Sequence, residues 1–394
     1  MAVTLLCGGR QTNLSALSFQ WPFASLDFGT TTESAIARPL RGSGGTFYRM
    51  HVNVDATATG RAIQFRKNLA NGNLVVSPTD STAGQFVDDT HSDTLVLGDT
   101  FDVQFSGSAV YIPRSFILTF YASTGTVAIY GNPIAAFTPS TSFTSISGGQ
   151  WLTTESQTAM VVRAPATHKN LIAVVIAAPT TNETLTSRKN SGAGNMTVTL
   201  TANTTGLFED TTNSDSVVSG DTYNFQLVGT TFLAFTVGYT AVCTSTVSEI
   251  VGPSGVSVSF NAATRFTQIS TGNEATVVTT ESAAQCNMPI DGTLSNARLS
   301  VTVNTMTSTW TRQLRINGAN ATQVLSVGAG ATGNFEDATH TDFFRVGDLV
   351  NFSESGGTAN SLAFNWSMLT VKPLDYAVYP DWQRRLPLRE VVGY

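Results

Sequence analysis

The chain has 394 residues, a net charge of −6 and a charged fraction of only 12%, well below the roughly 25% of ordinary globular domains. Its length fits three domains at roughly 100 to 200 residues each. Because the charge forms no basic stripe and no apolar run reaches membrane-spanning length, we expect neither nucleic-acid binding nor membrane insertion. The N-terminus has no charged region followed by a long apolar region, so we expect no secretion signal.

Short β-strands are predicted along the whole chain, because apolar residues alternate or form short runs bounded by Gly, Asn, Asp and Ser. In the middle of the chain, residues 171–176 form a continuous apolar run, 196–201 alternate, and 223–228 and 232–237 follow. The last two have counterparts on both sides, at 101–105 and 116–120 and at 349–352 and 362–366. No segment has a useful helical period, so the predicted fold class is all-β.

Several sequence signatures recur three times in the same order. Each copy has a Thr-Thr-Glu-Ser tetrapeptide, a basic strand that ends in Asn, a Gly-x-Phe-x-Asp motif and a Gly-Asp pair. Phe86 and Phe208 are 122 positions apart, and Phe208 and Phe335 are 127 apart. The other matched residues are Glu33, Glu155 and Glu281; Arg66, Arg188 and Arg315; and Gly98, Gly220 and Gly347. A repeat of this size is a whole domain rather than one turn of a solenoid.

These repeats divide the chain into an N-terminal arm and three copies, followed by a tail. We expect the arm at 1–22, the copies at 23–140, 141–262 and 263–374, and the tail at 375–394. Each copy is predicted to be a two-sheet sandwich of about eight antiparallel strands. Between copies, residues 129–137 and 251–260 align as crossovers that continue into strands, which favours packed neighbours. An extended rod remains the alternative.

Repeated aspartates are the candidate metal ligands. Carboxylates at turns can bind Ca²⁺, but the spacing of an EF-hand is absent, and an aspartate after glycine is also a common turn residue. We therefore expect no cofactor, with Ca²⁺ as the alternative. The candidates are Asp88, Asp93, Asp99, Asp210, Asp215, Asp221, Asp337, Asp342 and Asp348.

Catalytic signatures are missing from the sequence. His91 and His340 occupy matched places, but Asn213 stands there in the second copy, so the shared property is capping a turn rather than acid-base chemistry. His51 and His168 are isolated in the sequence. There is no nucleophile elbow, phosphate-binding loop or paired zinc-binding histidine motif. We predict that the protein is not an enzyme.

The order of the repeated motifs resembles a known family. A strand ending in Arg-Lys-Asn, an alternating strand, Gly-x-Phe-x-Asp-x-Thr and then Ser-Asp-x-Val-x-x-Gly-Asp is similar to the jelly-roll domains of the tumour necrosis factor and first-complement-component head type. More narrowly, it resembles the versions in bacteriophage and metagenomic virion proteins. The third copy departs at Ile316, where the others have Lys67 and Lys189, and no role is assigned to that lysine. The resemblance implies trimers, so three tandem jelly-roll copies are expected to pack as an intramolecular pseudo-trimer.

The tail at 375–394 breaks the repeat and concentrates aromatic residues, prolines and arginines. Tyr, Trp and Arg dominate the hot spots of protein interfaces. Two interpretations stay open, a strap across the chain's own jelly rolls or an arm that docks on another subunit. The candidate partner-binding residues are Tyr376, Tyr379, Trp382, Arg384, Arg385 and Arg389.

These observations favour a bacteriophage virion structural protein, such as a capsid decoration protein on the particle surface. Its expected partners are other virion proteins such as capsid subunits. The alternative is a receptor- or carbohydrate-binding component of a tail or fibre, with a host-surface glycan as partner, or a subunit of an extracellular filament.

Overall fold

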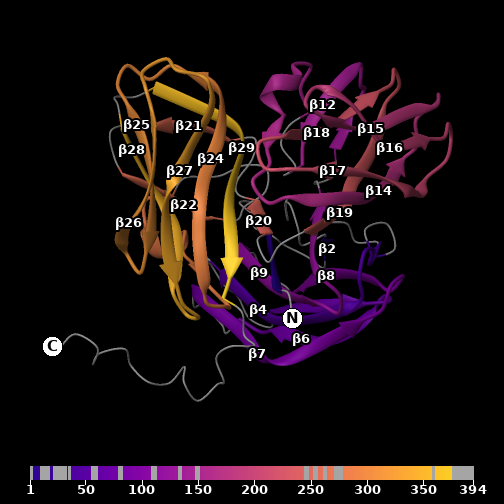
Figure 1. Ribbon diagram of the computed structural model, residues 1–394. Helices are drawn as coiled ribbons and strands as arrows, with labels where there is room; N and C mark the ends of the chain where they lie inside the picture. Colours follow the sequence, from indigo (N-terminus) through magenta and orange to yellow (C-terminus); the bar gives the residue numbers. More distant parts are fainter. Residues whose placement is uncertain are drawn as a thin grey trace.

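Three β-sandwich units follow one another along the chain and lie around a common centre (Figure 1). The structure is a computed structural model. It describes residues 3–8, 18–20, 33, 37–54, 61–78, 83–107, 113–131, 135–146, 151–243, 248–251, 256–260, 264–269, 278–356 and 360–374. Within these ranges there is no α-helix, and no helix is long and apolar enough to cross a membrane.

Each unit contributes nine or more strands. The first unit contains β1 (Val3–Gly8), β2 (Ser18–Gln20), β3 (Arg38–Pro39), β4 (Gly45–Val54), β5 (Ala62–Lys67), β6 (Ala70–Val76), β7 (Gly84–Leu95), β8 (Thr100–Ser106) and β9 (Pro113–Ala122). The second contains β10 (Thr126–Gly131), β11 (Ala135–Phe137), β12 (Thr141–Ser145), η2 (Glu155–Gln157), β13 (Met160–Val161), β14 (Ala166–Ala177), β15 (Glu183–Lys189), β16 (Gly192–Leu200), β17 (Gly206–Val217), β18 (Thr222–Val228) and β19 (Leu233–Cys243). The third contains β20 (Ser248–Val251), β21 (Val256–Phe260), β22 (Arg265–Thr267), η3 (Glu281–Ala283), β23 (Cys286–Asn287), β24 (Gly292–Asn304), β25 (Trp310–Ile316), β26 (Ala319–Val327), β27 (Gly333–Phe344), β28 (Leu349–Gly356) and β29 (Asn360–Pro373).

The same strand order recurs in every unit. One sheet of the first unit runs β1-β9-β4-β7 and the other β2-β8-β5-β6, with β3 also paired to β8. The second unit repeats this as β10-β19-β14-β17 and β12-β18-β15-β16, and the third as β20-β29-β24-β27 and β22-β28-β25-β26. All these pairs are antiparallel. Two packed antiparallel sheets with strands alternating between them form a jelly roll, so the fold is three tandem jelly rolls, as the sequence predicts.

The strand pairing divides the chain at different places from the expected boundaries. Residues 126–137 were assigned to the first copy, but β10 and β11 both pair with β19 and therefore belong to the second unit. Likewise, β1 lies in the expected N-terminal arm yet pairs with β9. The opening strand of each unit follows directly after the closing strand of the unit before it, which motif spacing alone does not reveal.

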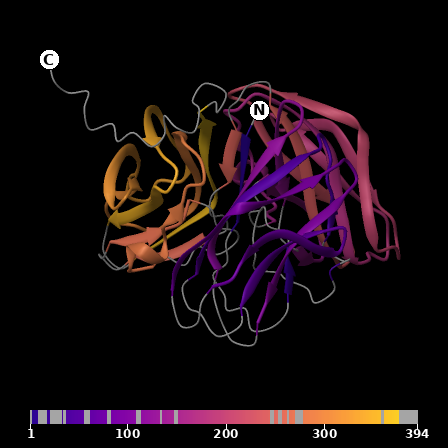
Figure 2. The same ribbon diagram turned by 90° about the horizontal axis from the view of Figure 1, so that it is seen from below.

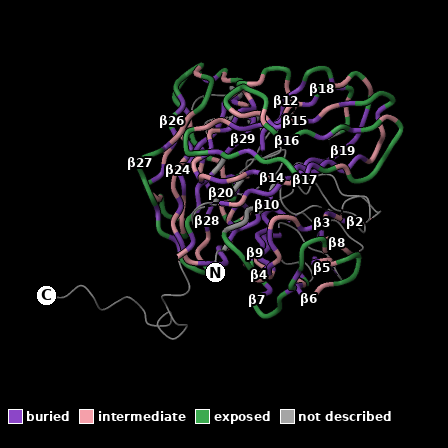
Figure 3. The backbone as a smooth tube through the Cα atoms, turned by 45° about the vertical axis from the view of Figure 1, so that its right-hand side comes forward, coloured by how far each residue is buried: buried purple, intermediate pink, exposed green. Residues whose placement is uncertain are grey.

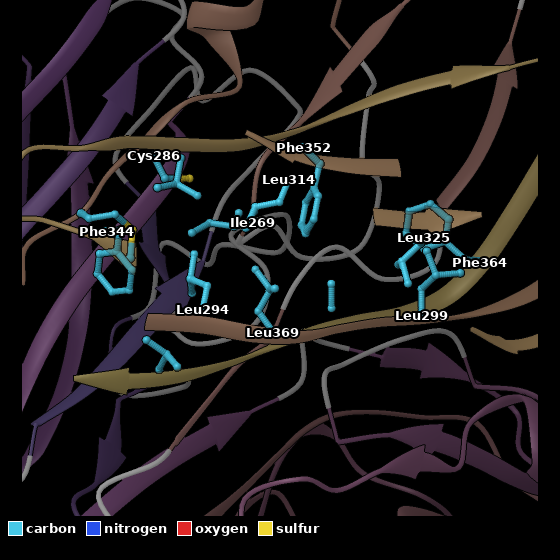
Figure 4. Packing of buried hydrophobic residues seen from close by; sticks show 14 of the residues in the cluster. Ile269, Cys286, Leu294, Leu299, Leu314, Leu325, Phe344, Phe352, Phe364 and Leu369 are labelled. Atoms are coloured by element: carbon cyan, nitrogen blue, oxygen red, sulfur yellow. The ribbon is translucent and has the colours of Figure 1, made fainter. Parts of the chain in front are cut away.

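Each unit has an apolar core between its two sheets. In the third unit, Leu294, Leu314, Phe352 and Leu369 point toward one another from β24, β25, β28 and β29 (Figure 4). Buried segments are concentrated inside the units and where the units meet, whereas the outer turns are exposed (Figure 3). The repeated Phe86 is only partly buried and packs against the core of the first unit.

The three units are packed against one another and are not separate beads. The matched strands β1, β10 and β20 contact one another at the centre, and Figure 2 shows the units grouped around it. Each apolar core also includes a residue of a neighbour. Trp366 of the third unit joins the core of the second, Leu5 of the first joins the third, and Ile129 of the second joins the first. Such a closed arrangement is what an intramolecular pseudo-trimer requires.

The third unit has a buried ion pair at a place where the other two units have apolar cross-strand pairs. Arg312 and Glu354, cross-strand neighbours on β25 and β28, are 1% and 0% exposed, with 3.6 Å between Arg312 Nε and Glu354 Oε1. Burial lowers the pKa of Arg312 and raises that of Glu354, while each charge opposes the shift of the other. The Thr267 hydroxyl donates to Glu354 at 2.8 Å. The cross-strand pairs at the matched positions are apolar, namely Ile63 with Phe105 and Leu185 with Leu227.

Replacing either charge alone strands the other in the core, so R312L or E354L should lower the unfolding free energy of the third unit by about 3–5 kcal/mol. The double variant R312L/E354L recreates the Leu185–Leu227 pair of the second unit and should lie close to the wild type or above it. Thermal and denaturant unfolding of the full chain measures both effects. A double variant as unstable as the single ones would contradict this account.

Candidate functional site

The repeated Thr-Thr-Glu-Ser tetrapeptide and the repeated arginine form one ion pair in every unit. Nε and Nη2 of Arg66 donate to the two carboxylate oxygens of Glu33, both at 2.8 Å. Two-point binding of this kind fixes the loop that carries the glutamate against the strand that carries the arginine. The same pairing recurs as Arg188 with Glu155 and Arg315 with Glu281.

The aspartate of Gly-x-Phe-x-Asp accepts backbone hydrogen bonds. Asp88 accepts the N–H groups of Val75, Thr90 and His91 at 2.9–3.1 Å, and the His91 ring also contacts its carboxylate. The same bonds recur from Thr197, Thr212 and Asn213 to Asp210 and from Val324, Thr339 and His340 to Asp337. The histidine side chain in two copies and the asparagine side chain in the other therefore have the same role, which is to bind the carboxylate of this aspartate.

The next repeated aspartate also binds the backbone of a neighbouring strand. Asp93 accepts the N–H groups of Asn73 and Leu74 at 2.8–2.9 Å. Asp215 accepts the N–H of Asn195, and Asp342 accepts those of Thr322 and Gln323. These carboxylates hold the edge of one sheet to that of the other.

The Gly-Asp pair closes a tight turn. Gly98 has a φ of +95°, a conformation that favours glycine, and Asp99 accepts the Val96 N–H at 3.0 Å and the Asn68 amide at 2.8 Å. Lys67 adds an ion pair to Asp99 at 3.2 Å. The second unit has the same arrangement, with Gly220, Asp221, Asn190 and Lys189.

The third unit lacks this ion pair, because Ile316 stands where the other units have Lys67 and Lys189. The sequence alone did not reveal this role of the lysine. Asn317, which follows Ile316, still binds Asp348 at 2.7 Å. Because Lys67 and Lys189 are about one-third exposed, solvent screens the lost pair and its contribution to stability is small.

Of the nine candidate metal ligands, six lie on β7, β17 and β27, and Asp99, Asp221 and Asp348 lie at tight turns. Asp88, Asp93 and their matches, as well as Asp99 and Asp221, bind protein N–H groups. Among the described residues, no group of three or more His, Cys, Asp or Glu side chains is placed to hold a metal ion. The geometry favours the turn interpretation of these aspartates, and the calcium alternative remains a prediction to be tested.

Two of the three contacts between units use the same ion pair. Arg41 of the first unit binds Glu209 of the second through two hydrogen bonds of 2.9 Å. Arg163, two residues after β13 as Arg41 is two after β3, binds Glu336 of the third unit in the same way. Glu209 and Glu336 are matched residues of β17 and β27. The Arg163 contact opposes the effect of burial and leaves the pKa of Glu336 below its usual range.

The contact between the third and first units, which we call the seam, lacks this pair. The matched positions hold Pro289 and Val87. Instead, the first unit supplies donors to main-chain oxygens of the third. Arg49 donates to the Pro289 carbonyl, and the Asn53 amide donates to the carbonyls of Ser282 and Gln285 at 3.0 and 2.7 Å.

A cavity of about 550 Å³ lies at the same seam. The first unit lines it with residues 53–54 and 83–84, and the third with Arg265 and with residues 278–280 and 282–283. Its lining combines threonine and serine hydroxyls, one amide and one guanidinium with small apolar groups. Such a surface suits a small polar ligand better than a large apolar one.

Serine, histidine and aspartate do meet in the second unit, but inside its core. The Ser187 and Tyr223 hydroxyls donate to Asp215 at 2.5 and 2.8 Å, and the Tyr223 ring contacts that of His168. Burial lowers the pKa of His168 to about 3. Because all four side chains are buried and the serine binds the carboxylate rather than the imidazole, the cluster is not a nucleophilic triad. In the first unit the matched residues of His168, Tyr223 and Ser187 are Phe47, Phe101 and Phe65.

The candidate partner-binding residues of the tail, Tyr376 to Arg389, lie outside the described residues. The last described contact of the third unit is the bond from the Leu374 N–H to the Asp291 carbonyl at 3.0 Å.

No known protein family matches the chain, and no curated protein matches it either. Two solved structures that are similar to this chain are of viral proteins. A chain in the atomic structure of Sulfolobus Turreted Icosahedral Virus is 10% identical, with 92% of each chain covered and a TM-score of 0.24. Another, described with the triple jelly roll fold and turret assembly in an archaeal virus, is 12% identical, with 92% of this chain and 91% of that chain covered and a TM-score of 0.22. TM-scores this low carry no argument about this chain.

If the repeated aspartates bind only protein N–H groups, calcium should not stabilise the fold. We expect the melting temperature of the full chain to be equal in 5 mM calcium chloride (about a thousandfold above typical sensor-site dissociation constants) and in EDTA. Binding to the native state alone would raise it. A calcium-dependent rise that the D88N variant loses would establish a metal site.

Acid should weaken the fold through Asp210 and Asp337. Burial acts to raise the pKa of Asp210, but the N–H donors outweigh it and lower the pKa to about 2, as they do for Asp337. A carboxyl with a lowered folded-state pKa stabilises the fold above its unfolded-state value and loses this effect as the pH falls toward 2. We expect the melting temperature to fall between pH 4 and pH 2, less steeply in D210N. An equally steep fall in D210N would contradict this assignment.

Proposed function

We propose that the protein is a structural component of a bacteriophage virion, a capsid decoration or other surface protein without catalytic activity. The observation that carries the proposal is the role of the repeated residues. The repeated Glu–Arg pairs, aspartates and turn asparagines all form bonds that hold loops, turns and strand edges. The residues that the three copies share therefore stabilise the jelly rolls. We place the residues that bind a partner outside this shared set.

The closed packing of the three units supports the same proposal. The resemblance to jelly-roll domains of the tumour necrosis factor and first-complement-component head type implies a trimer around a threefold axis. Here three units of one chain contact one another in turn, through Arg41 with Glu209, through Arg163 with Glu336 and across the seam. A compact three-lobed body suits a particle surface, where it can sit at a position of local threefold symmetry.

We place the attachment to the particle in residues 375–394. The large apolar side chains that the described units expose are spread over strands and turns of all three units, whereas the tail combines the aromatic residues and arginines that dominate interface hot spots. Its partner would be another virion protein such as a capsid subunit. Neither nucleic acid nor a membrane is part of the proposal, and neither is a cofactor.

A receptor- or carbohydrate-binding role in a tail or fibre is the second candidate. The cavity at the seam favours it, because hydroxyl and amide groups beside a guanidinium suit a polar sugar. In that case binding would depend on the residues that line the cavity, such as Asn53 and Arg265, and not on the tail.

A chain that ends after Leu374 keeps β29 and the bond to Asp291, so it should stay folded. We expect it to lose binding to particles of the encoding virus prepared without the protein, because the docking residues are gone. Co-sedimentation with those particles measures binding, and circular dichroism and the melting temperature check the fold. The matched control is the full-length W382A/R385A variant, which should weaken binding at least tenfold by loss of about 1.4 kcal/mol or more.

Full co-sedimentation of the truncated chain would overturn the tail assignment. Binding of the full-length chain to a glycan array, lost in R265A and kept in the truncated chain, would favour the carbohydrate-binding role instead.

A further inference from the structure

His51 occupies the seam at a position where the other units have different residues. It lies on β4 and is 3% exposed. The matched residues are Ile172 on β14 and Arg298 on β24, because each lies two residues after the bulge residue with positive φ, at Arg49, Asn170 and Asn296. Arg298 donates its Nε hydrogen to the carbonyl of Val161 in the second unit at 2.9 Å.

His51 makes the corresponding contact across the seam. Its Nδ1 lies 3.2 Å from the main-chain oxygen of Asn287, and Asn287 on β23 is the match of Val161 on β13. Its Nε2 lies 2.7 Å from Asp89 Oδ1 within the first unit. A carbonyl oxygen and a carboxylate can only accept, so both bonds form together only when both ring nitrogens carry a proton. In this position the imidazolium does what a permanent arginine cation does in the third unit.

The surroundings of the ring support a cation there. On β7, Asp89 faces it directly and the neighbouring Asp88 is bound to His91. On β4 the nearby charge is Arg49, which donates across the seam to Pro289. On β9 its cross-strand partner is Ile117, and β23 contributes Asn287 beside the buried Cys286 thiol. The hydrogen bond from His51, opposed by burial, leaves the pKa of Asp89 below its usual range, so the carboxylate is ionised at neutral pH.

We propose that the seam between the third and first units is a pH-sensitive joint, closed by the imidazolium of His51 and loosened when that ring loses a proton. The neutral ring has one N–H and cannot donate both to the main-chain oxygen of Asn287 and to Asp89. Its Nδ1 also lies 3.1 Å from the side-chain oxygen of Asn287. The seam is also the only contact between units without a chain connection, because the first unit continues into the second at residues 123–125 and the second into the third at 244–247. The cavity described above lies between the same two units.

The direction of the pH effect follows from the protonated form being the one that closes the seam. Closure is complete at a pH where imidazole is protonated and is lost as the pH rises. The test compares pH 5.5 with pH 8.0, which lie on either side of the pKa of about 6.5 of free imidazole. By contrast, the Arg163–Glu336 contact between the second and third units keeps its charges over this range.

Backbone hydrogen exchange of the full chain tests the proposal at the peptides covering 85–89 and 284–289. The variant H51R copies Arg298 and is positively charged at both pH values, and H51Q is neutral at both. Comparing each variant with the wild type at the same pH removes the intrinsic pH dependence of exchange. We expect the wild type to match H51R at pH 5.5 and to exchange about tenfold faster than H51R at pH 8.0, the effect of losing one charged hydrogen bond. H51Q should exchange faster than the wild type at pH 5.5 and match it at pH 8.0.

Two controls make the result specific. H340N copies Asn213 of the second unit at an exposed position of β27 and should leave the seam profile of the wild type unchanged. The peptide covering 157–163, at the contact of the second and third units, should not respond to His51 variants. A constant ratio of wild type to H51R at both pH values would overturn the proposal, as would equal exchange of H51Q and wild type at pH 5.5 or loss of the pH response in H340N.

Discussion

The structure depends on one constraint, namely that each unit leaves part of its apolar surface to be covered by a neighbour. The first strands of the three units meet at the centre, where they form sheet edges that a single jelly roll would expose. Leu5, Ile129 and Trp366 each pack in the core of another unit. Apolar burial is the main source of stability. Separating the units would expose these three side chains to water, so the same burial that stabilises each sandwich also holds the units together.

Much of the fold could be predicted from the sequence because its signatures mark backbone geometry. A glycine before an aspartate specifies a turn, and Gly98 indeed has a positive φ with Asp99 bound to the adjoining N–H. The triple repeat then fixed the number of units. The ion pair of Glu33 with Arg66 does not follow from the motifs themselves, because the two residues lie 33 positions apart and meet only in the folded unit.

The contacts between units could not be predicted in this way, for a physical reason. A sequence repeat reveals the residues that all three copies share. The contacts between unequal units use residues that differ from one interface to the next, so they do not recur in every copy. Arg41 and Arg163 occupy matched positions in the first two copies, but the third copy has Pro289 there. The arginine is therefore not recognisable as a repeated residue. For a related reason the strand pairing divides the chain elsewhere than the motif spacing does, because the strand at Thr126–Gly131 pairs with the unit that follows it.

Differences between the units therefore carry as much information as the repeats. Where a position faces only the unit's own core, different copies hold different residue pairs that both pack there. Arg312 with Glu354, for example, stands where the second unit has two leucines. Where a position faces a neighbour, the exchange changes how the units are joined. At the place of His51 the other two units have isoleucine and arginine, and the histidine and the arginine each contact a main-chain oxygen of a neighbouring unit. A chain with three linked copies can vary these contacts one at a time, which a trimer of identical subunits cannot do.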